Sequence, residues 1–247
     1  MDVSRAEWAL HRRAGSAGIA AAAAGVAGRF RAWRQDGLSA VLATDPGLRF
    51  LCTVTGVTAD TVASVADVLR SSRWDGLRPT VVASAEWGRA LTAAGLVATG
   101  ERPLAIRRLD RPPPAVDGVA AADGAFPALL LAGYDVTGVV ADYLVAEHRM
   151  PTVRRFVAIE DGAPVAAAAM TVHEDVAVLG GAATLPAYRG RGAQTRLLAH
   201  RLRLAADAGC VLAVATARSG SVSVANLRRA GFAIHRRLAW TVGPTAA

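Results

Sequence analysis

A short glycine- and arginine-rich segment carries the clearest chemistry in this sequence. Residues 186–192 read Pro-Ala-Tyr-Arg-Gly-Arg-Gly and lie between a β-prone run at 176–185 and an amphipathic run at 193–208 that predicts a helix. Glycines let the backbone turn tightly and expose successive N–H groups, and the first four N–H groups of a helix have no partner within it. Together with the helix dipole and the side chains of Arg189 and Arg191, the segment predicts a socket for a pyrophosphate or a similar anion.

Two other interpretations of this segment stay open. One is an ordinary strand–helix turn with solvent-exposed arginines. The other is a dinucleotide-binding loop, which the sequence disfavours. Residues 190–195 lack the third glycine of that motif, and its first glycine comes five residues after the strand and beyond a proline. The next strand, at 211–216, is followed by Ala217 and Arg218 and ends in no acidic residue.

The residues around the segment predict an α/β unit. Residues 155–160 and 164–172 form a hairpin about Asp161-Gly162, and Gly209 ends the helix that follows the glycine-rich segment. The remaining expected elements are a largely helical region at 127–147 with breaks near Gly133 and Gly138, a short helix at 224–230, and closing strands at 232–242.

Two stretches of this unit resemble signatures of a known superfamily. Thr184-Leu-Pro-Ala-Tyr-Arg-Gly-Arg-Gly-Ala-Gln-Thr-Arg-Leu-Leu198 resembles the acetyl-CoA loop of the GNAT superfamily of acetyltransferases, and Asn226-Leu-Arg-Arg-Ala-Gly-Phe232 is similar to its second signature. The resemblance covers roughly residues 115–247. It implies that loop amides hold the CoA pyrophosphate, while the preceding strand splays from its neighbour and holds the pantetheine and the thioester carbonyl. The implied acetyl-CoA contacts are Ala183, Thr184, Leu185, Arg189, Gly190, Arg191, Gly192, Ala193, Gln194, Thr195 and Asn226, the last of which could instead cap its own helix.

The sequence departs from the superfamily pattern at two places. Gln194 stands where the loop has a small residue, which crowds the helix start without removing its N–H groups. Leu227 occupies a position where many members have a tyrosine that protonates the leaving thiolate. An alkyl thiol has a pKa near 8.5, so the thiolate can leave without strong acid help.

The base that takes the proton of an attacking amine has no motif of its own. Glu147 and His148 follow the helical region that in this superfamily roofs the acceptor site, and they are the candidate catalytic residues, alongside surface roles for both. Glu174 and Asp175 lie at the far end of their strand, roughly 30 Å from Thr184 at ~3.3 Å per residue. That distance argues against them.

Residues 1–110 repeat the order of elements without the loop. They predict helices over 4–35 and then a β-α-β-α-β order up to residue 109, and the triple proline at 112–114 predicts a linker. We therefore expect an α/β protein of two tandem GNAT-like domains: a degenerate one at 1–110 without a phosphate loop, and a catalytic one at 115–247. The second has a mixed central sheet with a splayed strand at the acetyl-CoA site.

Composition excludes several classes of protein. The chain has 247 residues, 53% of them hydrophobic, and all 28 basic residues are Arg. Without lysine there is no phosphate-binding Gly-Lys loop, kinase lysine or Schiff base. The net charge of +8 splits evenly between 1–110 and 111–247, whereas nucleic-acid binders concentrate basic charge. We expect no nucleic-acid partner.

Cysteine, histidine and hydropathy patterns point to a cytoplasmic protein without a metal. Cys52 and Cys210 lie far apart in apolar runs, which favours buried thiols in a reducing compartment. The five histidines have no metal-ligand spacing, and no run approaches the ~20 apolar residues of a membrane span. The Ala-rich stretch at 17–27 imitates a secretion signal only faintly, because Asp2 and Glu7 precede it.

The predicted function is transfer of acetyl from acetyl-CoA, as co-substrate, to a small-molecule or peptide amine by direct attack on the thioester. The alternative is a non-catalytic acyl-CoA-binding or regulatory module, because no base is secured and Leu227 replaces a usual acid. The identity of the amine, and whether the chain is a monomer or a homodimer, stay open.

Overall fold

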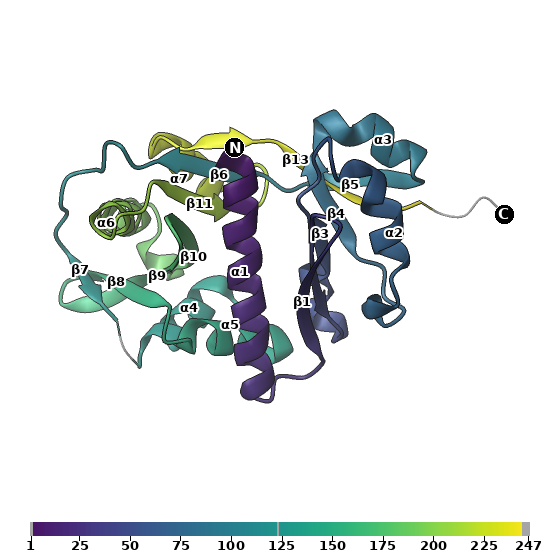
Figure 1. The fold of residues 1–247 in the computed structure, drawn as a ribbon. Helices are drawn as coiled ribbons and strands as arrows, with labels where there is room; N and C mark the ends of the chain where they lie inside the picture. The colour runs from purple at the N-terminus through teal and green to yellow at the C-terminus, as the bar shows by residue number, and fades with distance from the viewer. Residues whose placement is uncertain (1, 123, 244–247) are drawn as a thin grey trace.

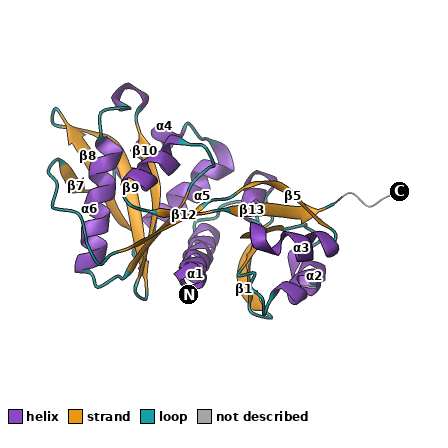
Figure 2. Cartoon of the chain, turned by 90° about the horizontal axis from the view of Figure 1, so that it is seen from above, coloured by secondary structure: helices purple, strands orange, loops and turns teal. Residues whose placement is uncertain are grey.

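The computed structural model describes residues 2–122 and 124–243, which form two mixed β-sheets with helices (Figures 1 and 2). The first sheet has the strand order β1-β2-β3-β4-β13-β5, and the second has the order β12-β6-β11-β10-β9-β8-β7. The expected α/β class is confirmed. The strands are β1 (Phe30–Gln35), β2 (Leu38–Ala43), β3 (Thr53–Thr55), β4 (Thr80–Ser84), β5 (Leu96–Glu101), β6 (Leu104–Arg108), β7 (Val119–Ala121), β8 (Arg154–Glu160), β9 (Ala163–His173), β10 (Val176–Thr184), β11 (Leu212–Thr216), β12 (Ala233–His235) and β13 (Arg237–Val242).

The long helix α1 (Asp2–Ala23) stands between the two sheets (Figure 1). Its buried alanines let both sheets approach closely, and it contacts β1 and β2 on one side and β9 and β10 on the other. The helical prediction over 4–35 is wrong beyond residue 23. Phe30–Gln35 is a strand that pairs with β2 through a turn at Asp36 and Gly37, where φ is +50° and +79°. This Asp-Gly turn favours a hairpin over a continued helix.

Each sheet contains one strand from the other half of the sequence. β6 pairs with β11 and β12 in the second sheet, and β13 pairs with β4 and β5 in the first. The expected boundary at the triple proline therefore does not separate the sheets, because the range 1–110 already contains β6. The chain crosses between sheets at Arg102-Pro103 and again at Arg236.

Helices cover both faces of the second sheet. α6 (Ala193–Asp207) packs on one face through Leu197 and Leu202, against residues such as Ala168 and Leu179. The other face carries α1, α4 (Phe126–Tyr134) and α5 (Gly138–Arg149). The central strands are buried on both faces, so they are apolar without alternation. The remaining helices are α2 (Val65–Arg70) and α3 (Gly88–Ala93) on the first sheet, and α7 (Val222–Arg229) after β11.

Candidate acetyl-CoA site

Strands β10 and β11 separate at the carboxyl end of their pairing. They run parallel from the Val176–Leu212 pair to the Leu179–Ala215 pair, but β10 continues to Thr184 without β11 beside it. β10 stays paired with β9 on its other side, apart from an irregularity between Gly180 and Ala183. The splayed strand expected at this position is therefore confirmed, and it leaves backbone groups of β10 facing a gap.

Two consecutive glycines, Gly180 and Gly181, make this bend possible. A Cβ at position 180 would lie 2.6 Å from a guanidinium nitrogen of Arg13, and one at position 181 would overlap Nε2 of His148. Gly181 also has φ of +56°, a conformation that side chains disfavour. A glycine pair inside a strand is a known sign of a bulge, so this signal was present in the sequence.

A groove of about 880 Å³ runs from the splayed strand along the glycine-rich loop to α7. Nine of the eleven residues that the resemblance implied line it together. Gly190 and Gly192 have φ of +79° and +83°, and Gly192 is the cap residue from which α6 begins. The nine are Ala183, Thr184, Arg189, Gly190, Gly192, Ala193, Gln194, Thr195 and Asn226.

The other two implied contacts lie outside the groove lining. The N–H of Leu185 donates to the Val165 carbonyl at 3.0 Å, and the guanidinium of Arg191 lies 5.2 Å from the ring centre of Tyr188. Asn226 does not cap its helix. Ser221 caps α7 by accepting a hydrogen bond from the N–H of Val224.

Two polar side chains of the loop are fastened to the scaffold. Gln194 donates to the carbonyl of Ala183 at 2.8 Å and also to the Thr184 hydroxyl and the Ala167 carbonyl. Arg189 donates to the carbonyls of Gly133 and Thr184. Because these side chains are already hydrogen-bonded, the loop offers an anion its backbone N–H groups and those of the first turn of α6.

Tyr134, at the end of α4, was not a candidate from sequence, and no motif marks it. Its hydroxyl accepts a hydrogen bond of 2.9 Å from the N–H of Ala182, in the bend of β10, and it lines the groove. Burial raises the pKa of Tyr134, partly opposed by the Ala182 N–H. Tyr134 thus stays protonated at neutral pH, beside the splayed strand.

Glu147 and His148 lie behind β10, outside the groove lining. Arg13 donates from Nε to Glu147 at 2.9 Å, and both side chains are largely buried. Burial raises the pKa of Glu147, but the charge of Arg13 and its hydrogen bond outweigh it, so the net shift is downward. Glu147 is therefore a paired carboxylate with weak basicity.

His148 is only 1% exposed. Its Nδ1 lies 2.8 Å from the Leu144 carbonyl, so Nδ1 carries the proton and Nε2 keeps the lone pair. Nε2 is buried beside Gly181 without a partner among the described residues. Burial lowers the pKa of His148, so its imidazole is neutral at pH 7.

Arg201 of α6 is a buried cation on the groove side. It is 3% exposed, donates to the carbonyls of Leu197, Ala169 and Gly180, and forms no ion pair within the described part of the chain. Burial lowers its pKa to about 10, which leaves it charged at neutral pH. The bend of β10 thus lies in a positive potential.

Comparisons with known proteins agree with this geometry. Residues 129–232, which include the splayed strand, the loop and α7, match the family described as acetyltransferase (GNAT) family. This segment is therefore similar to the acetyltransferase domains of the GNAT family. No curated protein matches the chain in sequence.

Solved structures share the fold across both sheets. A GCN5-related N-acetyltransferase from Kribbella flavida is 20% identical, with a TM-score of 0.64 over 92% of this chain and 96% of its own. One from Sphaerobacter thermophilus is 16% identical, with a TM-score of 0.57 over 85% and 82%. A tandem GNAT protein described as from the clavulanic acid biosynthesis pathway is 17% identical, with a TM-score of 0.56 over 89% and 80%. At these identities the likeness is one of fold.

Two further observations concern metals and membranes. Within residues 2–122 and 124–243, no group of three His, Cys, Asp or Glu side chains is placed to hold a metal ion. No helix in the same residues is both long and apolar enough to cross a membrane.

Proposed function

We propose that this chain is an N-acetyltransferase that moves acetyl from acetyl-CoA to an amine. The observation that carries the proposal is the continuous groove from the glycine-rich loop to the splayed end of β10, inside the segment that matches the GNAT family. A groove that joins an anion socket to unpaired strand amides suits a long molecule with a pyrophosphate at one end and a thioester at the other. The buried free thiols Cys52 and Cys210 favour the cytoplasm as its compartment.

Different parts of the groove would bind different parts of acetyl-CoA. The N–H groups at 190–195 would hold the pyrophosphate, and the backbone of Ala182 to Thr184, which has no β11 beside it, would hold the pantetheine. Acetyl-CoA supplies an activated acetyl group. The Ala182 N–H donates to the Tyr134 hydroxyl in this structure. When that hydroxyl turns toward the thiolate, the N–H becomes free to stabilise negative charge on the thioester carbonyl oxygen, with Arg201 adding positive potential.

Proton transfer is assigned to Tyr134 and His148. The ammonium of the acceptor first loses one proton, and its nitrogen then bonds to the carbonyl carbon as the carbon–sulfur bond breaks. The Tyr134 hydroxyl gives its proton to the leaving thiolate, and the nitrogen releases its second proton. Of the two base candidates from the sequence, the geometry favours His148, because its Nε2 lone pair faces the bend while Glu147 is held by Arg13.

The second candidate function is a non-catalytic acyl-CoA-binding module. One observation favours it: Nε2 of His148 is buried, and neither His148 nor Glu147 lines the groove. Two measurements separate the candidates, namely calorimetric titration with acetyl-CoA and thiol release from acetyl-CoA across a panel of amines. Acetyl-CoA binding with amine-dependent thiol release supports the enzyme. Binding without release for any amine supports the module, and absence of binding refutes both.

A further inference from the structure

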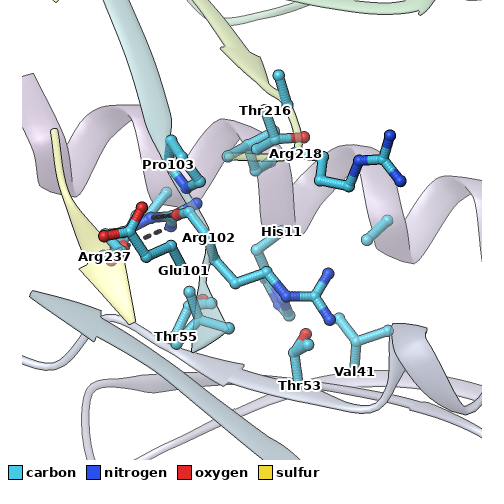
Figure 3. A pocket seen from close by; sticks show the side chains of 15 residues that line it. His11, Val41, Thr53, Thr55, Glu101, Arg102, Pro103, Thr216, Arg218 and Arg237 are labelled. Carbon is cyan, nitrogen blue, oxygen red and sulfur yellow. Dashed lines mark hydrogen bonds and ion pairs between the residues drawn. The ribbon is translucent and has the colours of Figure 1, made fainter. Parts of the chain in front are cut away.

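A second cavity, of about 600 Å³, lies between the two sheets (Figure 3). Its walls come from α1, from both sheets and from the crossing at Arg102-Pro103. It opens on the face of the second sheet that carries α1, whereas the acetyl-CoA groove follows α6 and α7 on the opposite face.

The two cavities meet at the splayed strands. Thr216, Ala217 and Arg218 line the second cavity, and they follow directly after Ala215, the last residue of β11 that pairs with β10. Arg218 lines both cavities. Arg218 therefore joins the two cavities just beyond the point where β11 leaves β10.

The cavity has an excess of positive charge. Its carboxylates are neutralised: Glu7 pairs with Arg237 at 2.8 Å and Glu101 pairs with Arg236 at 2.7 Å. Two other lining cations, Arg102 and Arg218, form no ion pair with a described residue. Figure 3 shows the Arg102 side chain extending over His11 toward Thr53, inside the cavity.

The rest of the lining is apolar, with one unsatisfied polar group. Leu10, Val41 and Val82 supply apolar walls. His11 projects from α1, and its Nδ1 is buried without a hydrogen-bond partner among the described residues (Figure 3). An unpaired buried nitrogen is costly unless a ligand or water satisfies it.

We propose that this cavity binds the acceptor, and that the acceptor is an amine that also carries a carboxylate and an apolar body, as an apolar amino acid does. Arg102 and Arg218 bind the carboxylate, the apolar walls hold the body, and the amine faces the gap between β10 and β11. This inference rests on the proposed acetyltransferase function, because only that function requires an acceptor. The first sheet then serves to complete the acceptor site.

The test measures acceptor binding apart from turnover. The full chain is first saturated with CoA, which carries no acetyl group and therefore cannot react. It is then titrated calorimetrically with L-phenylalanine, L-phenylalaninamide and 2-phenylethylamine. We expect phenylalanine to bind about tenfold more tightly than either analogue, because only it offers a carboxylate to the arginines. Arg102→Gln and Arg218→Gln should each reduce this preference to about twofold. The control Arg89→Gln, on the exposed side of α3, should retain it.

Each outcome bears on one proposal. Equal binding of the three probes, no binding of any of them by a CoA-loaded chain, or a preference that survives in both arginine variants would overturn the inference. Failure to bind CoA counts instead against the proposed function, since CoA occupies the other cavity. If Arg102→Gln and Arg218→Gln lost CoA binding while the wild type and Arg89→Gln kept it, these two side chains would belong to the CoA groove. That result would also overturn the inference.

Discussion

The hydroxyl of Tyr134 accepts a 2.9 Å hydrogen bond from the N–H of Ala182, so a side chain from α4 meets the backbone of the splayed strand at its bend. Leu227, where related signatures carry a tyrosine, lines the same groove from α7. The two positions approach the groove from different helices. The acid that is missing from α7 can thus be supplied from α4.

Tyr134→Phe tests this replacement. We expect kcat to fall by about 100-fold with acetyl-CoA affinity retained, because the proton donor is lost while the ring remains. Tyr143→Phe is the control, since Tyr143 packs against Phe30 in the core and lies outside the groove lining. Equal rates for the Tyr134 variant and the wild type would show that the thiolate leaves unaided.

The pH–rate profile offers an independent check on the same residue. Because burial raises the pKa of Tyr134, its ionisation lies above the ordinary value near 10. The rate should rise to a plateau as the amine and its base deprotonate, and should not decline until above about pH 10. A decline that begins below about pH 9 would identify a different acid.

Gly192→Glu should abolish acetyl-CoA binding. The change adds a carboxylate where the pyrophosphate approaches and a Cβ at φ of +83°. We expect at least about a 100-fold loss of affinity, measured by calorimetry. Gly209→Glu imposes similar backbone strain at φ of +79°, but at the far end of α6, and should bind normally. If both variants bind alike, the loop assignment is wrong.

The pair formed by Arg13 and Glu147 is expected to stabilise the fold. Removal of either partner leaves the other charge buried, so Arg13→Met and Glu147→Gln should each lose about 3–5 kcal/mol of unfolding free energy. The double variant should lose much less than the sum. Denaturant titrations of the wild type, the two single variants and the double variant give the four unfolding free energies of this double-mutant cycle. A stable Glu147→Gln protein with a greatly reduced rate would instead return the base role to Glu147.

Acid should destabilise the protein through His148. Its pKa is lower in the folded chain than the ordinary 6.5, so the unfolded chain binds protons more readily and stability is lost as the pH falls below about 6.5. Melting temperatures from about pH 7.5 to about 5.5 should therefore decline less in His148→Asn than in the wild type. The exposed His235 provides a control, because His235→Asn should leave the slope unchanged.

A fragment of residues 115–247 is expected not to fold. It lacks β6, the strand between β11 and β12, and it also lacks α1, which covers one face of the second sheet. The fragment retains β13 without the strands that pair with it. Circular dichroism should show no cooperative melting. A fragment that melts cooperatively and binds acetyl-CoA would contradict this expectation.

The parts of the site that the sequence predicts are those encoded locally. Residues 186–192 and the helix after them are contiguous, so glycine spacing and amphipathicity suffice to place the loop. The exchange of β6 and β13 depends on pairing between distant segments, which periodicity does not report. Tyr134 was missed for a similar reason: only the folded chain brings α4 against Ala182. Asn226 was misread as a possible cap because Ser221, the true cap, begins the helix earlier than expected.

The two crossings between the sheets have a mechanical consequence. Arg102-Pro103 and Arg236 lie side by side, because β5 pairs with β13 and β6 pairs with β12. These two chain connections fasten the sheets to each other along one edge of the space between them. Arg102, Pro103 and Arg237 form part of the cavity wall there. We expect any relative motion of the sheets to pivot about this fastened edge. Such a pivot would change the width of the cavity least beside the crossings, where Arg102 and Arg237 lie.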